Sequence, residues 1–337
     1  MTRVTTPTRW HIDIPGTRID AFPWRIEVLE FAGSEKGPAT AVLSGITGDK
    51  PLGILAMHDL AGVLKARAIA GTILVIACAN PYGFQAGTRH DPDLVELNRR
   101  FPGTTYGLLS DQVAHALMSA LVARVGTIID VHSGTAVRTT EYIYEYGNLA
   151  LAASFGNLPV MTGRAIPGQL CTEVSKAGLQ SALIEFGGPD RNTTATAVAG
   201  CLNMLRFLGH IDDAPTGPDK VAVIDRVKRI IASHDGILES ALGPADVGAT
   251  LQPGVLAWVT SATTGERLET FHIEAVGSTA GPGYEFDTLA GVKTRPFVVD
   301  ALPVLLLAQT VPSLVRPGNL LFLAGWVSEM MPTPRRH

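Results

Sequence analysis

Residues 110–134 read SDQVAHALMSALVARVGTIIDVHSG, and this stretch contains the unit from which the fold is predicted. Its first part, up to Val125, has apolar residues at the spacing of a helix that covers a core. Its second part, TIIDV (127–131), is a short apolar run with β-branched residues, which is typical of a buried strand. A helix that leads into a buried strand indicates an α/β chain.

The same alternation occurs on both sides of this stretch. Strand-like runs lie at 24–31, 39–45, 71–79 and 179–188, and helical patterns lie at 52–66 and 192–209. Strands that alternate with helices predict a mostly parallel or mixed sheet with helices on both faces.

The pattern changes after Gly209. APTGPDK (214–220) is rich in turn residues and is predicted to be a linker. One helical pattern follows at 225–233, and the rest consists of short β-type segments separated by Gly and Pro, including a predicted turn at 281–284. We therefore predict an α/β domain over residues 1–213, and a linker with a smaller C-terminal β-rich domain over residues 214–337.

Composition narrows the classes of partner. The 337 residues include 27 Lys and Arg against 31 Asp and Glu, and charged residues make up only 17%. Nucleic acids and acidic membranes require a clustered excess of basic residues, so we expect neither partner. The chain start lacks the apolar segment of a signal peptide and no apolar run spans a bilayer, which predicts a cytoplasmic protein. The oligomeric state stays open, a homo-oligomer included.

Polar side chains follow four of the predicted strands at the ends where those strands finish. In a parallel sheet these carboxyl ends meet at one edge, where ligands bind. The candidate residues are Thr47, Asp49 and Lys50 after 39–45, Arg89, His90, Asn98, Arg99 and Arg100 after 71–79, His132 after 126–131, and Glu185 at the end of 181–186. For a chain with few charges, this gathering predicts a functional site.

Three segments together resemble one enzyme family. ANPYGFQAGTRHDPDLVELNRRFPG (79–103), IDVHSG (129–134) and LIEFGG (183–188) are similar to motifs of the succinylglutamate desuccinylase/aspartoacylase family, in the zinc-carboxypeptidase superfamily. Those motifs are NP-x-A-x-x-x-x-TR, DLNR-x-FPG, DLH-x-G, and a Glu that ends a strand before glycines. The resemblance implies a carboxypeptidase-like fold, an appended β domain and a zinc-dependent deacylase that hydrolyses an amide bond in a small carboxylate-bearing molecule.

One motif of that family is altered here. The family carries HG-x-E after an early strand, and its His and Glu bind zinc together with the His of DLH. Here the segment reads GITGDKPLG (45–53), with Thr47 at the His position and Lys50 at the Glu position. His58 does not replace them, because it falls inside a predicted helix. A catalytic zinc needs three protein ligands, so the resemblance leaves His132 as a doubtful metal ligand, and both zinc and no metal stay open.

The other positions match the family's catalytic pattern. Glu185 corresponds to the general base, which takes a proton from water and later gives it to the leaving amine. Arg89 corresponds to the arginine that polarises the scissile carbonyl. Asn98 and Arg99 correspond to the pair that holds the substrate carboxylate, which a guanidinium group binds bidentately. Thr47 adds a hydroxyl donor for the substrate.

Lys50 has several chemical interpretations. A tethered ammonium group can stabilise negative charge on a carbonyl oxygen, although it cannot lower the pKa of a bound water as zinc does. Lys50 could instead act as a base or nucleophile after losing its proton. It could also form a structural ion pair with Glu185 or Asp49. The sequence does not decide among these roles.

The leading hypothesis is a hydrolase that cleaves an amide or related acyl bond, as in an N-acyl amino acid, with Lys50 replacing the charge of the metal. The alternatives are a zinc enzyme that uses His132, a non-catalytic protein that binds small carboxylates, and a Lys50-dependent lyase or C–C hydrolase. Asp130 shares a strand face with His132, where it could either orient the imidazole or cap the end of the strand.

Overall fold

The chain forms two compact units in the computed structural model. The described residues are 6–163, 165–188, 193–275, 287–289, 292–299, 304–310 and 313–335. The first unit comprises residues 1–135, 142–221 and 331–337, and the second comprises residues 136–141 and 222–330. The sequence did not indicate that residues 136–141 belong to the second unit or that residues 331–337 belong to the first. The turn predicted at 281–284 lies outside the described residues.

The first unit contains most of the helices. In chain order its elements are β1 (Thr8–Thr17), β2 (Pro23–Ala32), β3 (Glu35–Ser44), α1 (Pro51–Leu64), β4 (Ala70–Ile76), α2 (Pro81–Ala86), the 3-10 turn η1 (Leu97–Arg99), α3 (Leu109–Val122), β5 (Thr127–Ser133), β7 (Tyr142–Tyr146), α4 (Leu149–Ala153), β8 (Val160–Met161), α5 (Leu170–Lys176), β9 (Gln180–Phe186) and α6 (Thr194–Leu208). The helices predicted at 52–66, 110–125 and 192–209 correspond to α1, α3 and α6.

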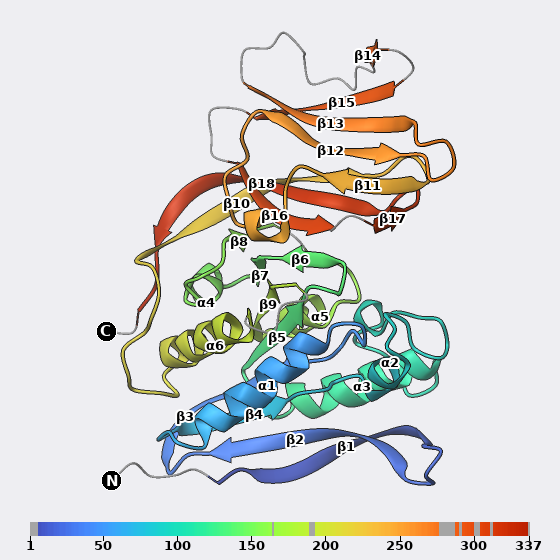
Figure 1. Ribbon diagram of the computed structural model, residues 1–337. Coiled ribbons are helices and arrows are strands. Elements are labelled where there is room, and N and C mark those ends of the chain that lie inside the picture. Colours follow the sequence, from blue (N-terminus) through green and yellow to red (C-terminus); the bar gives the residue numbers. More distant parts are fainter. Residues whose placement is uncertain are drawn as a thin grey trace. The chain divides into compact units, whose positions relative to one another are not determined.

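The strands of the first unit form a mixed sheet in the order β1-β2-β4-β3-β5-β9-β7-β8 (Figure 1). β3 runs parallel to β4 and to β5, and β5 runs parallel to β9. β1 and β2 pair antiparallel, as do β2 and β4, and β7 and β9. The carboxyl ends of β3, β4, β5 and β9 therefore meet at one edge, and the expected mixed α/β sheet is confirmed.

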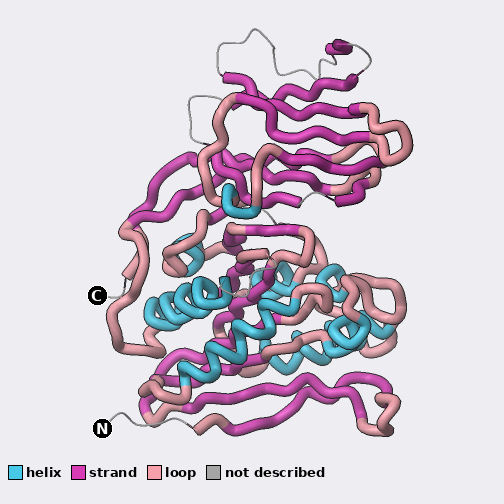
Figure 2. The backbone as a smooth tube through the Cα atoms, in the orientation of Figure 1, coloured by secondary structure: helices cyan, strands magenta, loops and turns pink. Residues whose placement is uncertain are grey.

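Helices cover both faces of this sheet (Figure 2). α1, α4 and α6 bury their apolar side chains against one face, in a core that includes Leu60, Ile129 and Leu205. α3 and α5 cover the other face, in a core that includes Leu117 and Ile128. Ile128 and Ile129 are consecutive, so the alternation of side chains along β5 supplies both cores.

The described residues of the second unit form strands and one short 3-10 turn. Its elements are β6 (Arg138–Thr140), β10 (Lys220–Ile231), β11 (Gly236–Ser240), η3 (Pro244–Asp246), β12 (Gly254–Thr260), β13 (Arg267–Ala275), β14 (Asp287–Leu289), β15 (Val292–Val299), β16 (Val304–Thr310), β17 (Ser313–Val315) and β18 (Leu320–Pro332). They form the strand orders β10-β18-β16-β6 and β14-β15-β13-β12-β11-β17. The expected β-rich C-terminal region is therefore present.

The helical pattern predicted at 225–233 is wrong, because most of that stretch belongs to strand β10. The β10 sequence KVAVIDRVKRII is rich in Val and Ile, whose branched side chains favour strands. In the part of the chain that the structure describes, none of the helices has the length and apolar character needed to cross a membrane.

Candidate active site

β5 and β9 place site side chains next to each other. His132 of β5 pairs with Glu185 of β9 in the parallel register, so both side chains project from the same face of the sheet. Asp130 lies two residues before His132 and shares that face. Asp130 and His132 are buried, and Glu185 is partly exposed. The sequence prediction that the two strand ends meet is therefore confirmed.

The segment between β3 and α1 is held by close backbone packing. A Cβ atom on Gly48 would lie 1.9 Å from the carbonyl carbon of Gly83 in α2, and one on Gly53 would lie 2.1 Å from the hydroxyl oxygen of Ser44. Only glycine permits these approaches. They hold the segment that contains Lys50, which occupies the N-cap position of α1 without a side-chain capping hydrogen bond.

Lys50 forms an ion pair with Glu185. Its Nζ donates to Oε1 at 2.9 Å and to Oε2 at 2.8 Å, and the two side chains are only 10% and 12% exposed. Burial acts to raise the pKa of Glu185, but the charges of Lys50, His132 and Arg89 outweigh it. The pKa of Glu185 is therefore below its ordinary value, and its carboxyl group is ionised at neutral pH.

His132 lies between two carboxylates. Its Nε2 is 2.9 Å from Oδ2 of Asp130, and its Nδ1 is 3.9 Å from Oε1 of Glu185. Oδ1 of Asp130 is buried and has no hydrogen-bond partner among the described residues. Asp130 thus holds one nitrogen of the imidazole and leaves the other on the side of Glu185.

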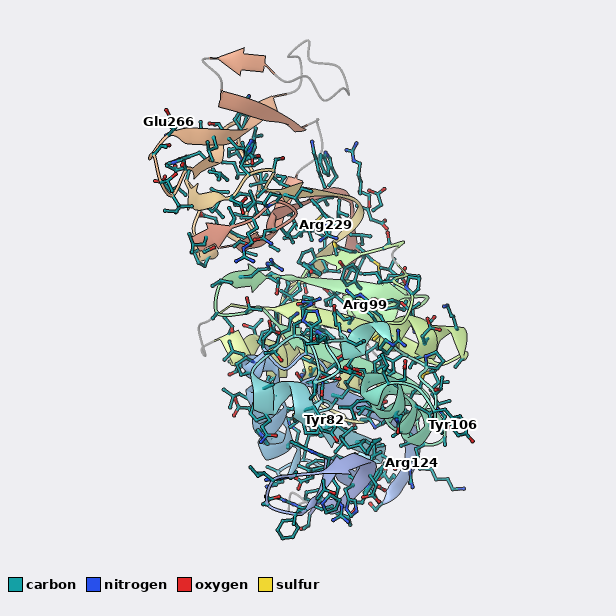
Figure 3. All side chains as sticks on the ribbon, turned by 90° about the vertical axis from the view of Figure 1, so that its right-hand side faces the viewer. Tyr82, Arg99, Tyr106, Arg124, Arg229 and Glu266 are labelled. Atoms are coloured by element: carbon teal, nitrogen blue, oxygen red, sulfur yellow. The ribbon has the colours of Figure 1, made fainter. Side chains whose placement is uncertain are left out.

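Arg89 and Arg99 are bridged by Glu96. One oxygen of Glu96 lies 2.8 Å from Nη2 of Arg89 and 3.2 Å from Nη1 of Arg99. Burial acts to lower the pKa of Arg89, and the charge of Glu96 outweighs it, with further contributions from Asp49 and Glu185. The pKa of Arg89 is therefore raised. Figure 3 labels Arg99 in the first unit.

Thr47 and Asn98 are more deeply buried than their predicted substrate roles suggest, at 3% and 2% exposure. Oδ1 of Asn98 accepts a hydrogen bond from the backbone N of Leu170, at 3.0 Å. Asn98 thus fixes η1 to the start of α5, and this bond holds the neighbouring Arg99.

Glu96 is the site residue that the sequence reasoning missed. The available signal was its position directly before LNR, where the family motif carries an Asp. Arg100, in contrast, forms a two-point ion pair with Asp111, at 2.6 and 2.8 Å. Arg100 therefore stabilises the first turn of α3 and is not part of the group of side chains around Glu185.

The side chains around His132 do not fit a three-ligand zinc site. Among the residues that the structure describes, no three His, Cys, Asp or Glu side chains gather in an arrangement able to hold a metal ion. Lys50 brings a positive charge to the same carboxylate that His132 faces. His58 is exposed on α1, so it does not complete the set.

Comparisons with known proteins agree with this architecture. The family model of the succinylglutamate desuccinylase/aspartoacylase catalytic domain matches residues 36–211. The N-alpha-acetyl-L-2,4-diaminobutyric acid deacetylase of Halomonas elongata is 32% identical over 100 residues. These residues are 29% of this chain and 29% of that protein, so the match spans less than a third of the relative's length.

Two solved structures share the fold over nearly the whole chain. A succinylglutamate desuccinylase/aspartoacylase from Rhodobacter sphaeroides is 18% identical, with a TM-score of 0.75 and coverage of 97% of each chain. The product-bound ectoine utilization protein EutE (DoeB) from Ruegeria pomeroyi is 20% identical, with a TM-score of 0.74 and coverage of 97% of this chain and 100% of that one. Since the family model covers more than half of the sequence, this chain belongs to the succinylglutamate desuccinylase/aspartoacylase family.

Proposed function

We propose that the protein is an amidohydrolase that removes the acyl group from a small N-acyl amino acid, and that the ammonium group of Lys50 supplies the positive charge that a metal supplies in its relatives. The observation that carries this proposal is the buried contact of Lys50 with both oxygens of Glu185, beside His132. The family membership supports the reaction class.

Glu185 is suited to the proton transfers. Its lowered pKa keeps it ionised at neutral pH, so it can accept a proton as a water molecule attacks the carbonyl carbon. The same proton then passes to the amide nitrogen as the C–N bond breaks. The second proton of the water also ends on the nitrogen, so the products are a carboxylate and an ammonium group, and Glu185 returns to its ionised form.

Lys50 and Arg89 are suited to stabilise the carbonyl oxygen as it becomes negative. An ammonium group has three N–H donors, and Glu185 accepts two of them here. The third can be donated to the oxygen of the intermediate. Lys50 also stands at the N-cap position of α1, and the partial positive charge of that helix end acts in the same direction.

Arg99 is suited to bind the carboxylate of the amino acid. Its planar guanidinium matches a carboxylate in two-point geometry, and Glu96 holds it next to Arg89. The H. elongata relative is described as a deacetylase of an N-acetyl amino acid, which supports the same substrate class for this chain.

The test measures turnover of a panel of N-acyl amino acids by detecting the amine that is released. Glu185→Gln keeps the shape of the side chain and removes the base, so kcat should fall by about a hundredfold or more. Arg99→Lys should mainly raise KM. Glu27→Gln is the control, because that side chain is 63% exposed on β2. Full activity of Glu185→Gln would exclude the proposal.

The ion pair also favours one other function, which is the binding of small carboxylates without turnover. Lys50 donates to both oxygens of Glu185, the carboxylate that would act as the base. Such a protein would be stabilised by ligand, by about 2.7 kcal/mol at 100 times the Kd, with no product. A lyase that uses Lys50 covalently would form an imine, which borohydride would trap in the presence of substrate.

A further inference from the structure

A tight turn over residues 91–95 follows Arg89 of the candidate site. It lies in the segment between α2 and α3, which can be followed in Figure 1. The backbone N of Asp91 donates to the carbonyl oxygen of Val95 at 2.9 Å, and the backbone N of Leu94 donates to that of Asp91 at 2.8 Å. Leu94 has a φ of 62°, which is unfavourable for a residue with a side chain. Contacts with the rest of the fold must therefore hold the turn closed.

Asp91 and Asp93 fasten this turn to the helices on either side. Oδ1 of Asp91 accepts a hydrogen bond at 2.6 Å from Nδ2 of Asn80, the N-cap residue of α2. Asp93 accepts hydrogen bonds from the backbone N of Ser110, in the first turn of α3, at 2.8 Å and from the backbone N of Val95 at 3.2 Å. Asp91 is only 1% exposed and Ser110 is fully buried, so water does not take part in these contacts.

One hydroxyl group lies between the two carboxyl groups. Oγ of Ser110 is 3.0 Å from Oδ2 of Asp91 and 2.8 Å from Oδ1 of Asp93. A serine hydroxyl has one proton to donate, and an ionised carboxylate has none. If both carboxyl groups were ionised, one of the two contacts would join two acceptors without a proton. A proton on one of them removes this conflict, since its O–H donates to Ser110 and Ser110 donates to the other.

Burial and charge favour Asp91 as the group that carries this proton. Burial raises the pKa of Asp91, and the charge of Asp93 acts in the same direction. The hydrogen bonds from Asn80 and Ser110 and the charge of His90 act to lower this pKa, but they do not outweigh burial. The pKa of Asp91 is therefore above its ordinary value of 3.8.

The other titratable groups around the turn do not supply a cation to Asp91. Tyr82 of α2 faces it, and burial together with the charge of Asp91 raises the pKa of that phenol to about 12, so Tyr82 is neutral at pH 7. Arg100 interacts with the charge of Asp93, but it is taken up by both oxygens of Asp111. Among the described residues, Asp91 thus has no Lys or Arg partner, and a buried carboxyl group without one tends to keep its proton.

We propose that Asp91 is protonated at neutral pH and that, through Ser110 and Asp93, it acts as a positioning residue that holds the turn next to Arg89. The protonation does not depend on the function proposed above, whereas the effect on Arg89 rests on it. Loss of the proton would place two buried negative charges on one hydroxyl group and open the turn. Because the folded pKa of Asp91 is raised, stability should fall as pH rises through that pKa.

The test of the protonation is infrared difference spectroscopy of the full chain at pH 7. The unmodified protein should show the C=O band of a protonated carboxyl group that Asp91→Asn lacks. Asp13→Asn is the matched control, because that side chain is 73% exposed on β1, and it should keep the band. No difference between the unmodified protein and Asp91→Asn in this band, or its loss in Asp13→Asn as well, would overturn the proposal.

Urea unfolding provides a second readout. The amide introduced by Asp91→Asn can donate to Ser110 as the protonated carboxyl group does, so the midpoint at pH 7 should stay close to that of the unmodified protein. Asp93→Asn removes one of two oxygens that accept from backbone N–H groups, so its midpoint should be lower. From pH 6 to pH 9 the midpoint should fall further in the unmodified protein than in Asp91→Asn. A lower midpoint in Asp91→Asn than in Asp93→Asn would contradict the assignment of the proton.

The effect on Arg89 is measured separately, with the N-acyl amino acid that is turned over fastest. The kcat/KM of the unmodified protein should fall at alkaline pH as Asp91 loses its proton. Asp91→Asn should lack this alkaline fall, and Asp13→Asn should keep it. The same fall in Asp91→Asn would show that the proton does not position Arg89. The infrared and unfolding results decide the protonation of Asp91 whether or not the protein turns over a substrate.

Discussion

Nζ of Lys50 lies 2.9 and 2.8 Å from the two carboxylate oxygens of Glu185. Both side chains are largely buried, and the charge of Lys50 favours the ionised form of Glu185. Breaking a buried ion pair from one side is costly because it leaves an unpaired charge. The catalytic proposal and the stability of this part of the sheet therefore depend on the same contact.

Lys50→Met should raise the pKa of Glu185. Burial raises that pKa, and the charge of Lys50, which the substitution removes, makes the largest contribution that lowers it. In the unmodified protein the lowered pKa gives stability above pH 4.5, which is lost as pH falls through the folded pKa. In the variant the raised pKa reverses this sign, so stability is lost as pH rises through the folded pKa. Urea unfolding at pH 5 and pH 8 should show a loss of stability with rising pH in the variant, whereas the Glu185 contribution in the unmodified protein is complete over this window.

The acid limb of kcat/KM should move to higher pH in Lys50→Met, since Glu185 must be ionised to act as the base. Lys176→Met is the matched control, because Lys176 is 61% exposed and pairs with Glu173 on the surface. Identical pH dependence of unfolding in Lys50→Met and Lys176→Met would show that Lys50 does not control Glu185.

Glu96→Gln should raise KM by about tenfold, because the neutral amide holds Arg89 and Arg99 less firmly in position. The fall in kcat should be smaller, since Glu185 is unchanged. Glu96→Asp restores the charge and should recover part of the affinity. Steady-state kinetics of the two variants checks this, and an unchanged KM in Glu96→Gln would show that the bridge has no positioning role.

Gly48→Ala and Gly62→Ala should change stability in opposite directions. The Cβ atom on Gly48 would overlap the backbone of Gly83 at 1.9 Å, and the forced movement should destabilise the fold by about 2 kcal/mol or more. Gly62 lies within α1 with no atom within 4 Å of the added Cβ. Its replacement should stabilise the helix by about 0.5–1 kcal/mol. Thermal unfolding of the two variants measures whether each substitution stabilises or destabilises the protein.

His210→Gln should weaken the dependence of stability on pH. Nδ1 of His210 lies 2.9 Å from the carbonyl oxygen of Ala70 and Nε2 lies 2.8 Å from Oγ1 of Thr40. Its pKa falls from 6.5 to about 4 on folding, so the unfolded chain binds more protons in this window. Stability should therefore fall by about 3 kcal/mol as pH drops from 7 to 4.

The variant should lose that contribution, which urea unfolding at pH 7.5 and pH 5 would detect. His58→Gln is the control, because His58 is exposed on α1. A pH slope in His210→Gln equal to that of the unmodified protein would contradict the assignment.

The sequence was most informative where several constraints coincide. The apolar runs that became β3, β5 and β9 are short, β-branched and followed by polar residues, so they predicted both the parallel strands and the edge where Lys50, His132 and Glu185 meet. Weakly patterned segments were less informative. β10 was partly misread as a helix, because its side chains alternate only irregularly between buried and exposed positions.

Two features of the site could not be predicted from the chain alone. Glu96 contacts Arg99 three residues later and Arg89 seven residues earlier, and no spacing rule gives the second of these contacts. The partner of Lys50 was also open between Asp49 and Glu185, because the contact with Glu185 joins residues that lie 135 positions apart in the sequence. Both outcomes depend on contacts between segments that are distant in the sequence.

The most direct test of the account is the activity of metal-free protein. The full chain would be treated exhaustively with a chelator, its metal content measured by elemental mass spectrometry, and its kcat/KM compared with that of untreated protein. Because Lys50 is proposed to supply the positive charge beside Glu185, we expect an unchanged kcat/KM at substoichiometric metal. Activity that is lost with the removal of stoichiometric zinc, and that returns when zinc is added, would contradict it.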